Sequence, residues 1–317
     1  MVAVPFALKK GTIYQDIPLP DSLFIAHQAL WALGAQVSIL DIQECQKAIV
    51  NGAHFDFVLE LSGYGINSNM NELLSTLCGS MGIGYFPSSG LARKIATNKL
   101  IAKRFAAQAG LKIPATIIDL PSKNDKILVC KPIFGGDSLG VEVISTLEQQ
   151  DYQFKDNKFF EEFIDGVDVT ILTFYESVVS KNQIVGAFEN TDSSGEIITT
   201  YETKKIDQLI YGRTKRTRRS VFDKINSDTI KGIHQFLDIL GNPKVCRFDF
   251  RLSKETNSYY FLEANIDPTF GNNGIWYEPL KCWSVRSRYS QLMINLSLLP
   301  IHRSAVAIAF LISIDYM

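Results

Sequence analysis

Residues 245–266 read VCRFDFRLSKETNSYYFLEANI, and this stretch decides how the chain folds around its polar residues. Two strand-like runs, residues 245–252 and 259–266, are separated by the turn-forming residues KETN. Alternating apolar and polar residues on either side of such a turn predict a β-hairpin. Polar residues at fixed positions in both runs would then face each other.

The expected hairpin gathers Asp249, Glu263 and Asn265. Glu263 and Asn265 are two residues apart on one strand and therefore share a face. An all-oxygen cluster of this kind suits Mg²⁺, which keeps waters and takes carboxylates together with substrate phosphates, and it suits zinc poorly. The alternative is a surface hairpin with ordinary solvated charges.

The composition is that of an ordinary globular protein of 317 residues with a formal net charge of -1. The near-zero charge gives no general electrostatic case for nucleic acid or an anionic membrane. Five widely spaced cysteines without a CxxC pattern indicate buried thiols in a reducing cytoplasm rather than disulfides or zinc ligands. The four histidines form no metal-binding motif, and no signal peptide is evident.

The first part of the chain alternates strand-like and helix-like segments, which predicts a small parallel α/β domain over residues 1–88. The expected strands are residues 2–8, 36–41 and 55–61, and the expected helices are residues 21–33, capped by Asp21 or Ser22, and residues 71–81.

We expect a second unit over residues 89–164 and a third over residues 165–317. The second unit opens with a helix over residues 91–109, closed by Gly110, and continues with strands at residues 127–132, 141–145 and 158–164, after a short strand between Pro114 and Pro121. The third has strands at residues 167–174 and 196–202, a helix at residues 221–240, the hairpin, and a terminal helix at residues 283–299. An apolar run at residues 305–314 is too short to span a bilayer and is expected to be a strand or a helix, with a peripheral membrane contact as the alternative.

A glycine-rich loop, IFGGDSLG at residues 133–140, lies between two of the expected strands. Gly135 and Gly136 let backbone N–H groups face an anion without obstruction by Cβ atoms, although glycines of this kind also serve tight turns. A nucleoside triphosphate needs such amides together with cations and metal-binding carboxylates. Neither a P-loop nor a GxGxxG motif is present.

The order of several short motifs resembles the ATP-grasp fold in its D-alanine–D-alanine ligase branch, from about Asp56 to Asn265. Each motif is weak alone, and their joint order and spacing carry the resemblance. The motifs are Thr97-Asn98-Lys99, Lys131-Pro132 with the loop to Val141, Phe160-Glu161-Glu162-Phe163-Ile164-Asp165-Gly166, Tyr201-Glu202-Thr203-Lys204, Arg247-Phe248-Asp249 and Glu263-Ala264-Asn265.

The resemblance implies three subdomains, with the nucleotide bound between the central and C-terminal ones, and a role for each matching residue. Lys99 and Lys131 would bind ATP phosphates beneath a flap containing Gly135, Gly136 and Ser138, and Lys204 would bind a phosphate or the adenine edge. Glu161 would contact the adenine amino group, Phe163 and Ile164 would contact the adenine ring, and Asp168 would bind the ribose hydroxyls. Asp249, Glu263 and Asn265 would bind a pair of Mg²⁺ ions, with Mn²⁺ as a substitute, and Arg247 and Ser138 would be catalytic. Taken singly, each of these residues also has an ordinary structural explanation, such as a solvated lysine, an edge-strand charge or a core phenylalanine.

The chemistry implied is ATP-dependent joining of a carboxylate to an amine through an acyl phosphate. Its partners are small molecules, with no nucleic acid or membrane, and a homodimer through the first domain follows from the resemblance alone. The alternatives are an ATP-grasp enzyme with a non-amino-acid acceptor and a catalytically silent ATP-binding module.

Departures from the family concern the substrate rather than ATP. Residues 9–16, KKGTIYQD, do not match the family's glycine-rich turn with its serine and glutamate. Asp137-Ser138 replaces a pair of serines in the flap, and Lys205 replaces a tyrosine. Residues 267–269 read DPT instead of beginning Pro-Gly, and Gly274 stands where the family has a serine that grips the second substrate's carboxylate. We therefore expect a product other than D-alanyl-D-alanine, made in specialised metabolism.

A basic stretch at residues 213–219, RTKRTRR, is not explained by these motifs. We expect a solvated loop beside the active site, with a lid over an anionic substrate as the alternative. Nucleic-acid binding is disfavoured because no aromatic stacking pattern accompanies the cations.

Overall fold

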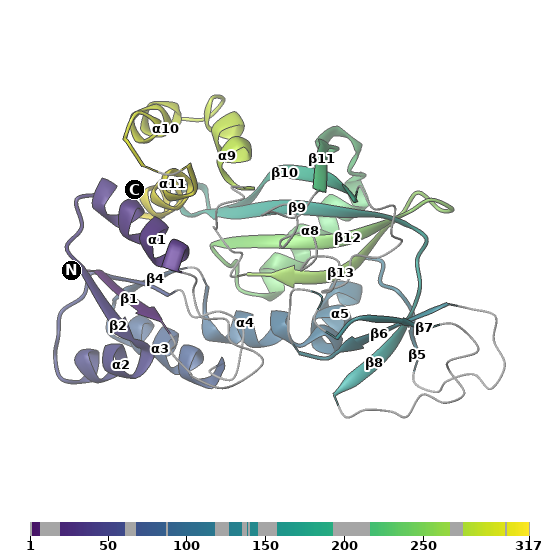
Figure 1. Cartoon of the computed structure of the whole chain (residues 1–317), viewed down its shortest axis with the longest axis horizontal. Coiled ribbons are helices and arrows are strands. Elements are labelled where there is room, and N and C mark those ends of the chain that lie inside the picture. Colours follow the sequence, from purple (N-terminus) through teal and green to yellow (C-terminus); the bar gives the residue numbers. More distant parts are fainter. Residues whose placement is uncertain are drawn as a thin grey trace.

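The computed structural model describes residues 2–6, 20–60, 68–86, 88–117, 127–134, 138, 140–144, 157–192, 216–266, 275–301 and 303–316. The strands in these ranges form three sheets, two of four strands and one of five (Figure 1). The mixture of helices and sheets expected from the sequence is confirmed.

The N-terminal sheet is parallel, in the order β2-β1-β3-β4. Its strands are β1 (Val2–Phe6), β2 (Val37–Asp41), β3 (Phe57–Leu59) and β4 (Gly84–Phe86). Successive residues of β3 point to opposite faces, so Val58 packs with α2 (Ile42–Val50) and α3 (Ser68–Ser80), and its neighbours pack with α1 (Pro20–Ala32). The predicted parallel α/β arrangement is correct.

Three details of this part differ from the sequence prediction. Helix α1 begins at Pro20, one residue before the expected start, and the expected caps Asp21 and Ser22 lie among residues whose side chains are not described. Helix α2 and strand β4 were not anticipated. Asp41 caps α2 by accepting a hydrogen bond from the Glu44 amide at 2.6 Å, and Glu44 accepts one from the Asp41 amide at 3.0 Å. This reciprocal capping box was a readable signal for the helix.

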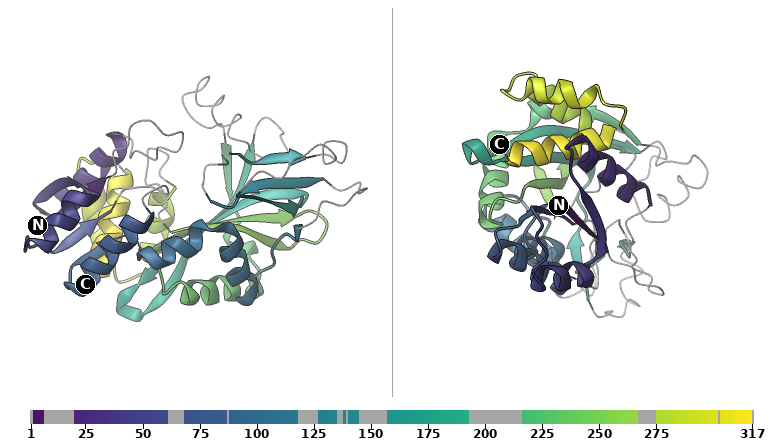
Figure 2. Two further views of the ribbon diagram at one scale, coloured as in Figure 1. Left: turned by 90° about the horizontal axis from the view of Figure 1, so that it is seen from below. Right: turned by 90° about the vertical axis from the view of Figure 1, so that its left-hand side faces the viewer.

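The expected single helix over residues 91–109 is wrong: the segment forms α4 (Gly90–Thr97) and α5 (Lys99–Gln108). Asn98 separates them with a non-helical backbone, and its side chain caps α5 by accepting a hydrogen bond from the Ile101 amide. The break sets Lys99 at the first turn of a new helix. The two helices extend from the N-terminal sheet toward the smaller antiparallel sheet (Figures 1 and 2). Gly110 follows α5 with a φ of +81°, as expected.

The smaller antiparallel sheet has the order β5-β8-β6-β7. Its strands are β5 (Thr116–Ile117), β6 (Leu128–Pro132), β7 (Glu142–Ile144) and β8 (Lys158–Glu162), close to the predicted positions. A small core of Leu128, Cys130, Ile144 and Phe160 holds it together. Lys131 lies on β6 and Glu161 on β8, so this sheet carries two of the predicted nucleotide-binding residues.

The five-stranded antiparallel sheet has the order β11-β10-β9-β12-β13. Its strands are β9 (Gly166–Glu176), β10 (Lys181–Asp192), β11 (Arg216–Ser220), β12 (Val245–Ser253) and β13 (Tyr259–Asn265), with single 3-10 turns at Ser177–Val179 and Phe222–Lys224. One face packs on α5 and α8 (Ser227–Ile239). The predicted hairpin is confirmed as β12 and β13.

Parts of this region were predicted wrongly or not at all. Strand β10 was not anticipated, and the strand expected at residues 196–202 lies outside the described residues. The helix expected at residues 221–240 is shorter, beginning after the Asn226 cap. Part of the basic stretch forms β11, with exposed Arg218 and Arg219, rather than a loop.

Three helices complete the chain, namely α9 (Tyr277–Ser284), α10 (Ser290–Ser297) and α11 (Arg303–Tyr316). The single helix expected at residues 283–299 is therefore wrong. The apolar run at residues 305–314 is helical and buried between α1 and one end of the five-stranded sheet (Figure 1). No described helix has the length and apolar character that a membrane span requires. All five cysteines are free thiols, and of these Cys282 is exposed, contrary to the expectation that all are buried.

Candidate active site

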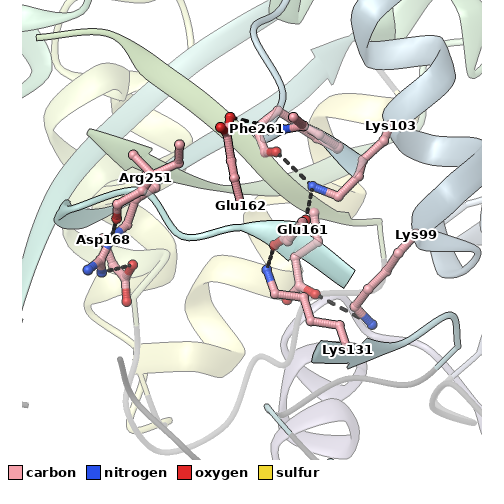
Figure 3. Close-up of polar contacts among 11 residues, drawn as sticks. Lys99, Lys103, Lys131, Glu161, Glu162, Asp168, Arg251 and Phe261 are labelled. Carbon is pink, nitrogen blue, oxygen red and sulfur yellow. Dashed lines mark hydrogen bonds and ion pairs between the residues drawn. The ribbon is translucent and has the colours of Figure 1, made fainter. Parts of the chain in front are cut away.

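A buried carboxylate with lysines on either side lies where α5 meets the smaller antiparallel sheet (Figure 3). Lys103 Nζ lies 2.8 Å from Glu161 Oε2, and Lys131 Nζ forms a close ion pair with Glu161 Oε1. Lys103 also donates a hydrogen bond to the Phe261 carbonyl on β13 at 3.3 Å. One ammonium group therefore connects α5, β8 and β13.

A third lysine extends this cluster toward the hairpin. Lys99 Nζ lies 3.8 Å from Glu263 Oε2. Among the described residues, three lysines thus face the two carboxylates of Glu161 and Glu263, which leaves positive charge in excess in this part of the chain. Both Lys99 and Lys103 are largely buried, at 7% and 2% exposure. Such an excess of buried cations favours binding of an anion.

Burial and charge act in opposite directions on these groups. Burial lowers the pKa of Lys99 and of Lys103, although Glu263 and Glu161, respectively, act to raise it. Burial alone would raise the pKa of Glu161, but Lys131 and Lys103 together outweigh it, so this pKa is lowered. Glu161 is therefore held as a carboxylate, whereas the lysines would gain from a bound anion.

The hairpin brings the predicted acidic residues together. Asp249 lies directly opposite Glu263, and Arg247 lies directly opposite Asn265. Side chains at directly opposite positions have Cβ atoms about 5 Å apart. A β-bulge follows Asp249, after which the apolar side chains of both strands pair in the core. The predicted convergence of Asp249, Glu263 and Asn265 is therefore confirmed.

Asp249 is fixed from two sides. Arg247 donates two hydrogen bonds to Oδ2, at 3.1 Å from Nε and 2.8 Å from Nη2. Thr170 on β9 donates to Oδ1 at 2.9 Å, and Asn190 on β10 donates to Thr170 Oγ1 at 3.0 Å. A chain of hydrogen bonds across three strands thus orients the carboxylate.

The donor set of the hairpin fits a hard divalent cation. Burial raises the pKa of Asp249, Arg247 opposes this effect, and the Glu263 carboxylate adds to it. A cation shared by the two carboxylates would relieve their repulsion. Within the described ranges, no group of three or more His, Cys, Asp or Glu residues could hold a metal. Two carboxylates and the Asn265 amide would leave coordination positions for water and phosphate oxygens, as Mg²⁺ prefers.

Asp168, Phe163 and Ile164 lie around a buried arginine, Arg251 on β12. Arg251 Nη1 lies 2.8 Å from Asp168 Oδ1, and Arg251 Nε donates to the Ile164 carbonyl at 3.0 Å. Its guanidinium carbon lies 5.8 Å from the centre of the Phe163 ring. Glu162, next to Glu161, has a separate task, because its Oε1 accepts a hydrogen bond from the Ala115 amide at 2.9 Å (Figure 3).

The expected phosphate flap is described only in part. Ser138 has a φ of +62°, in the left-handed region that non-glycine residues rarely adopt. Its carbonyl accepts a hydrogen bond from the Val141 amide at 3.2 Å. Gly135, Gly136 and Lys204 lie outside the described residues, so their predicted roles are not tested.

The sequence prediction missed three polar residues of this site, namely Lys103, Thr170 and Arg251. Each follows a predicted site residue at the spacing that puts two side chains on the same face of a helix or a strand. Lys103 lies four positions after Lys99 on a helix, where side chains share a face. Thr170 and Arg251 each lie two positions after a predicted aspartate on a strand. The periodicity therefore contained the signal.

Comparison with known proteins agrees with this geometry. A family model described as an ATP-grasp domain matches residues 96–241. The D-alanine–D-alanine ligase of Trichlorobacter lovleyi is 27% identical over 271 residues, which cover 80% of this chain and 81% of the ligase.

Solved structures show the same fold. The D-alanine–D-alanine ligase of Bacillus anthracis in complex with ATP matches with a TM-score of 0.62 at 14% identity, covering 97% of each chain. The VanG D-Ala:D-Ser ligase of Enterococcus faecalis matches with a TM-score of 0.57 at 14% identity, covering 99% of this chain and 98% of the ligase. The motifs, the arrangement of the sheets and these relatives agree: residues 96–241 match the ATP-grasp domain, and the chain resembles the D-alanine–D-alanine ligases in sequence and in fold.

Proposed function

We propose that the protein is an ATP-dependent ligase that joins the carboxylate of one small molecule to the amine of another. The observation that carries this proposal is the 3.8 Å contact between Lys99 and Glu263. It brings the lysine cluster around Glu161 next to the acidic pair of the hairpin. Phosphoryl transfer needs both features at one place, since cations hold the phosphates and carboxylates hold the metal.

Each residue has a proposed role in holding ATP. In this proposal, Lys99 and Lys131 bind phosphates under the flap that contains Gly135, Gly136 and Ser138, and Lys204 binds a phosphate or the adenine edge. Phe163 and Ile164 lie beside the adenine ring, and Glu161 accepts a hydrogen bond from the adenine amino group. Asp168 accepts hydrogen bonds from the ribose hydroxyls. Because Glu161 is 1% exposed and paired with Lys131, the adenine contact requires Lys131 to exchange its carboxylate partner for a phosphate oxygen.

The proposed reaction has two steps. A carboxylate oxygen of the first substrate attacks the γ-phosphorus of ATP, the bond to the β-phosphate bridging oxygen breaks, and ADP leaves. The amine nitrogen of the second substrate then attacks the carbonyl carbon of the acyl phosphate, loses a proton, and expels phosphate. Arg247, held by Asp249, would neutralise charge on the transferring phosphoryl group and on the tetrahedral intermediate.

We propose Asp249, Glu263 and Asn265 as the ligands of a Mg²⁺ pair. When bound, these ions would neutralise phosphate charge and align the reacting oxygens. Thr170 and Arg247 hold the Asp249 carboxylate in one orientation before any ligand arrives. Such preorganisation avoids reorientation of the ligand during the reaction.

We further propose that the product is not D-alanyl-D-alanine. Support comes from the sequence, because Gly274 stands where the family has the serine that grips the carboxylate of the second substrate, and residues 267–269 read DPT. These changes fit a ligase of specialised metabolism that joins an amino acid or a small peptide to a second substrate other than D-alanine. The curated relative from T. lovleyi is a D-alanine–D-alanine ligase, so D-alanine is the necessary comparison substrate.

Some expectations about organisation are also carried as proposals. The three sheets support boundaries near residues 88 and 164 for three subdomains, with the nucleotide between the second and the third. The free thiols support a reducing compartment such as the cytoplasm. A homodimer through the first subdomain rests on the family resemblance.

The test is ADP release from ATP and Mg²⁺ across a library of D- and L-amino acids, followed by the product mass. We expect a product whose mass is the sum of two substrates less one water, and no ADP release by Asp249→Asn. Highest turnover with D-alanine alone would overturn the proposed change of substrate. ATP binding without ADP release for any pair, including non-amino-acid amines, would instead indicate a silent binding module.

A further inference from the structure

Arg251 is a buried arginine on the face of β12 that carries the proposed catalytic residues. It is 7% exposed, and its partner Asp168 lies directly opposite on β9, with 36% of its side chain exposed. A buried guanidinium is stable only when it is paired and hydrogen-bonded. Three of the partners of Arg251 belong to one end of the proposed nucleotide site.

Three contacts of Arg251 go to Asp168, Ile164 and Phe163. Two are charge-assisted hydrogen bonds, at 2.8 Å to Asp168 Oδ1 and 3.0 Å to the Ile164 carbonyl. The third places the guanidinium over the Phe163 ring at 5.8 Å. One side chain therefore contacts the residues proposed for both ribose and adenine. Figure 3 shows Arg251 beside Asp168.

Strand β12 also relates this arginine to the phosphate end of the site. Arg247, Asp249 and Arg251 are each two residues apart and share one face, at a spacing of about 7 Å per step. Asp168 and Thr170 have the same relation on β9, and Thr170 binds Asp249. The strand pair thus runs from Arg247, proposed for the phosphoryl group, past Asp249, proposed as a metal ligand, to Arg251 beside the residue proposed for the ribose.

We propose that Arg251 is a positioning residue that makes this site selective for a ribonucleotide over a 2′-deoxyribonucleotide. The inference rests on the proposed function, because it assigns the ribose hydroxyls to Asp168. A carboxylate offers about four acceptor positions. Arg251 engages Oδ1 and holds the carboxylate in one orientation, so positions remain at which the ribose hydroxyls can donate.

The test compares the binding of ATP and 2′-deoxy-ATP, each with Mg²⁺, by titration calorimetry. A hydrogen bond to a charged group contributes enough that wild type should bind ATP on the order of 10-fold more tightly than 2′-deoxy-ATP. Arg251→Met and Asp168→Asn should each bring this ratio close to one. The double variant should show no further loss, because both changes remove the same interaction.

Two further variants separate positioning from general stability. Arg251→Lys keeps the charge but lacks the planar fork, so it should retain only part of the discrimination. Lys254→Met removes an exposed ion pair, 3.0 Å from Asp165, at the end of the same hairpin strand, and it should leave the ratio unchanged. The affinity ratio refers to folded protein alone, so lower stability of a variant does not mimic the expected result.

The outcomes distinguish this inference from the proposed function. Wild type that binds ATP and 2′-deoxy-ATP equally well would overturn the ribose selectivity and leave the ligase proposal standing. Arg251→Met that weakens both nucleotides by the same factor would overturn the positioning role. Wild type that binds neither nucleotide would overturn the proposed function and this inference together.

Discussion

Two buried ion clusters in this molecule differ in their balance of charge. In the N-terminal part, Arg93 on α4 pairs with Glu60 just after β3, and the side chains are 2% and 0% exposed. Tyr85 donates a further hydrogen bond to Glu60 at 3.2 Å. Among the residues that the structure describes, one cation there faces one anion. In the active site, three described lysines face two carboxylates.

The difference indicates what each cluster is for. The N-terminal pair joins α4 to the end of β3 with one charge of each sign, so we infer that its role is to hold α4 on the N-terminal sheet. In the unbalanced cluster, burial lowers the pKa values of Lys99 and Lys103, and a bound anion would act to raise them. Structural and functional ion pairs can therefore be separated by counting charges within one buried cluster.

The largest effect is expected from the balanced pair. Arg93→Met leaves the Glu60 carboxylate buried with its cation removed, which costs about 3–5 kcal/mol of unfolding free energy. Urea denaturation would measure this loss. Glu60→Leu combined with Arg93→Met should recover most of it, because both charges are then absent. Nucleotide affinity of the folded fraction should stay at the wild-type value in either variant.

The next effect concerns the unbalanced cluster. Lys131→Met should lower the rate of ADP release by about 10²–10³, the loss typical of removing one charge-stabilising donor. Its stability should fall much less than that of Arg93→Met, because Lys103 still neutralises Glu161. Lys158→Met, which removes a lysine 2.6 Å from Glu142 in the same sheet, should keep the wild-type rate. Equal losses of stability in Lys131→Met and Arg93→Met would erase the distinction between the clusters.

The hairpin could be predicted because its signals are local. Alternation and a turn specify β12 and β13, and the period of two brings Glu263 and Asn265 to one face. The same rule, applied once more, would have found Arg251 and Thr170. What it could not supply is the partner of each residue across the sheet. The pairing of β12 with β9 joins residues about 80 positions apart in the chain, as Asp168 and Arg251 show.

Other errors arose where local patterns compete. Residues 91–109 are mostly strong helix formers, and the weak formers Thr97 and Asn98 mark the break, where Asn98 caps the next helix through Ile101. Residues 305–314 are apolar on every side because α1 and the five-stranded sheet bury them together, and such a segment has no periodicity that tells helix from strand. The excess positive charge around Glu161 is likewise a tertiary property, since the three lysines and two carboxylates of the cluster lie on four different elements.

The smallest expected effect tests the charge state of Glu161. Its pKa is lowered below the ordinary value of 4.5, since Lys131 and Lys103 overcome the effect of burial. The folded protein therefore gains stability from this carboxylate at pH values above 4.5 and loses it as the pH falls through the lowered pKa. Urea denaturation over a series of acidic pH values should show a shallower loss of unfolding free energy for Glu161→Gln than for wild type.

The lysines can be tested as the cause of this pH dependence. Lys103→Met removes one of the two cations that lower the pKa of Glu161, so its stability should fall less steeply with acidification than that of wild type. Lys103→Arg keeps the cation at that position and should retain the wild-type slope. Parallel curves for wild type and Glu161→Gln would mean that the carboxylate gains nothing from the folded state. The lysine cluster could not then be a preformed site for an anion. The contrast with the Glu60 and Arg93 pair would then lose its physical basis.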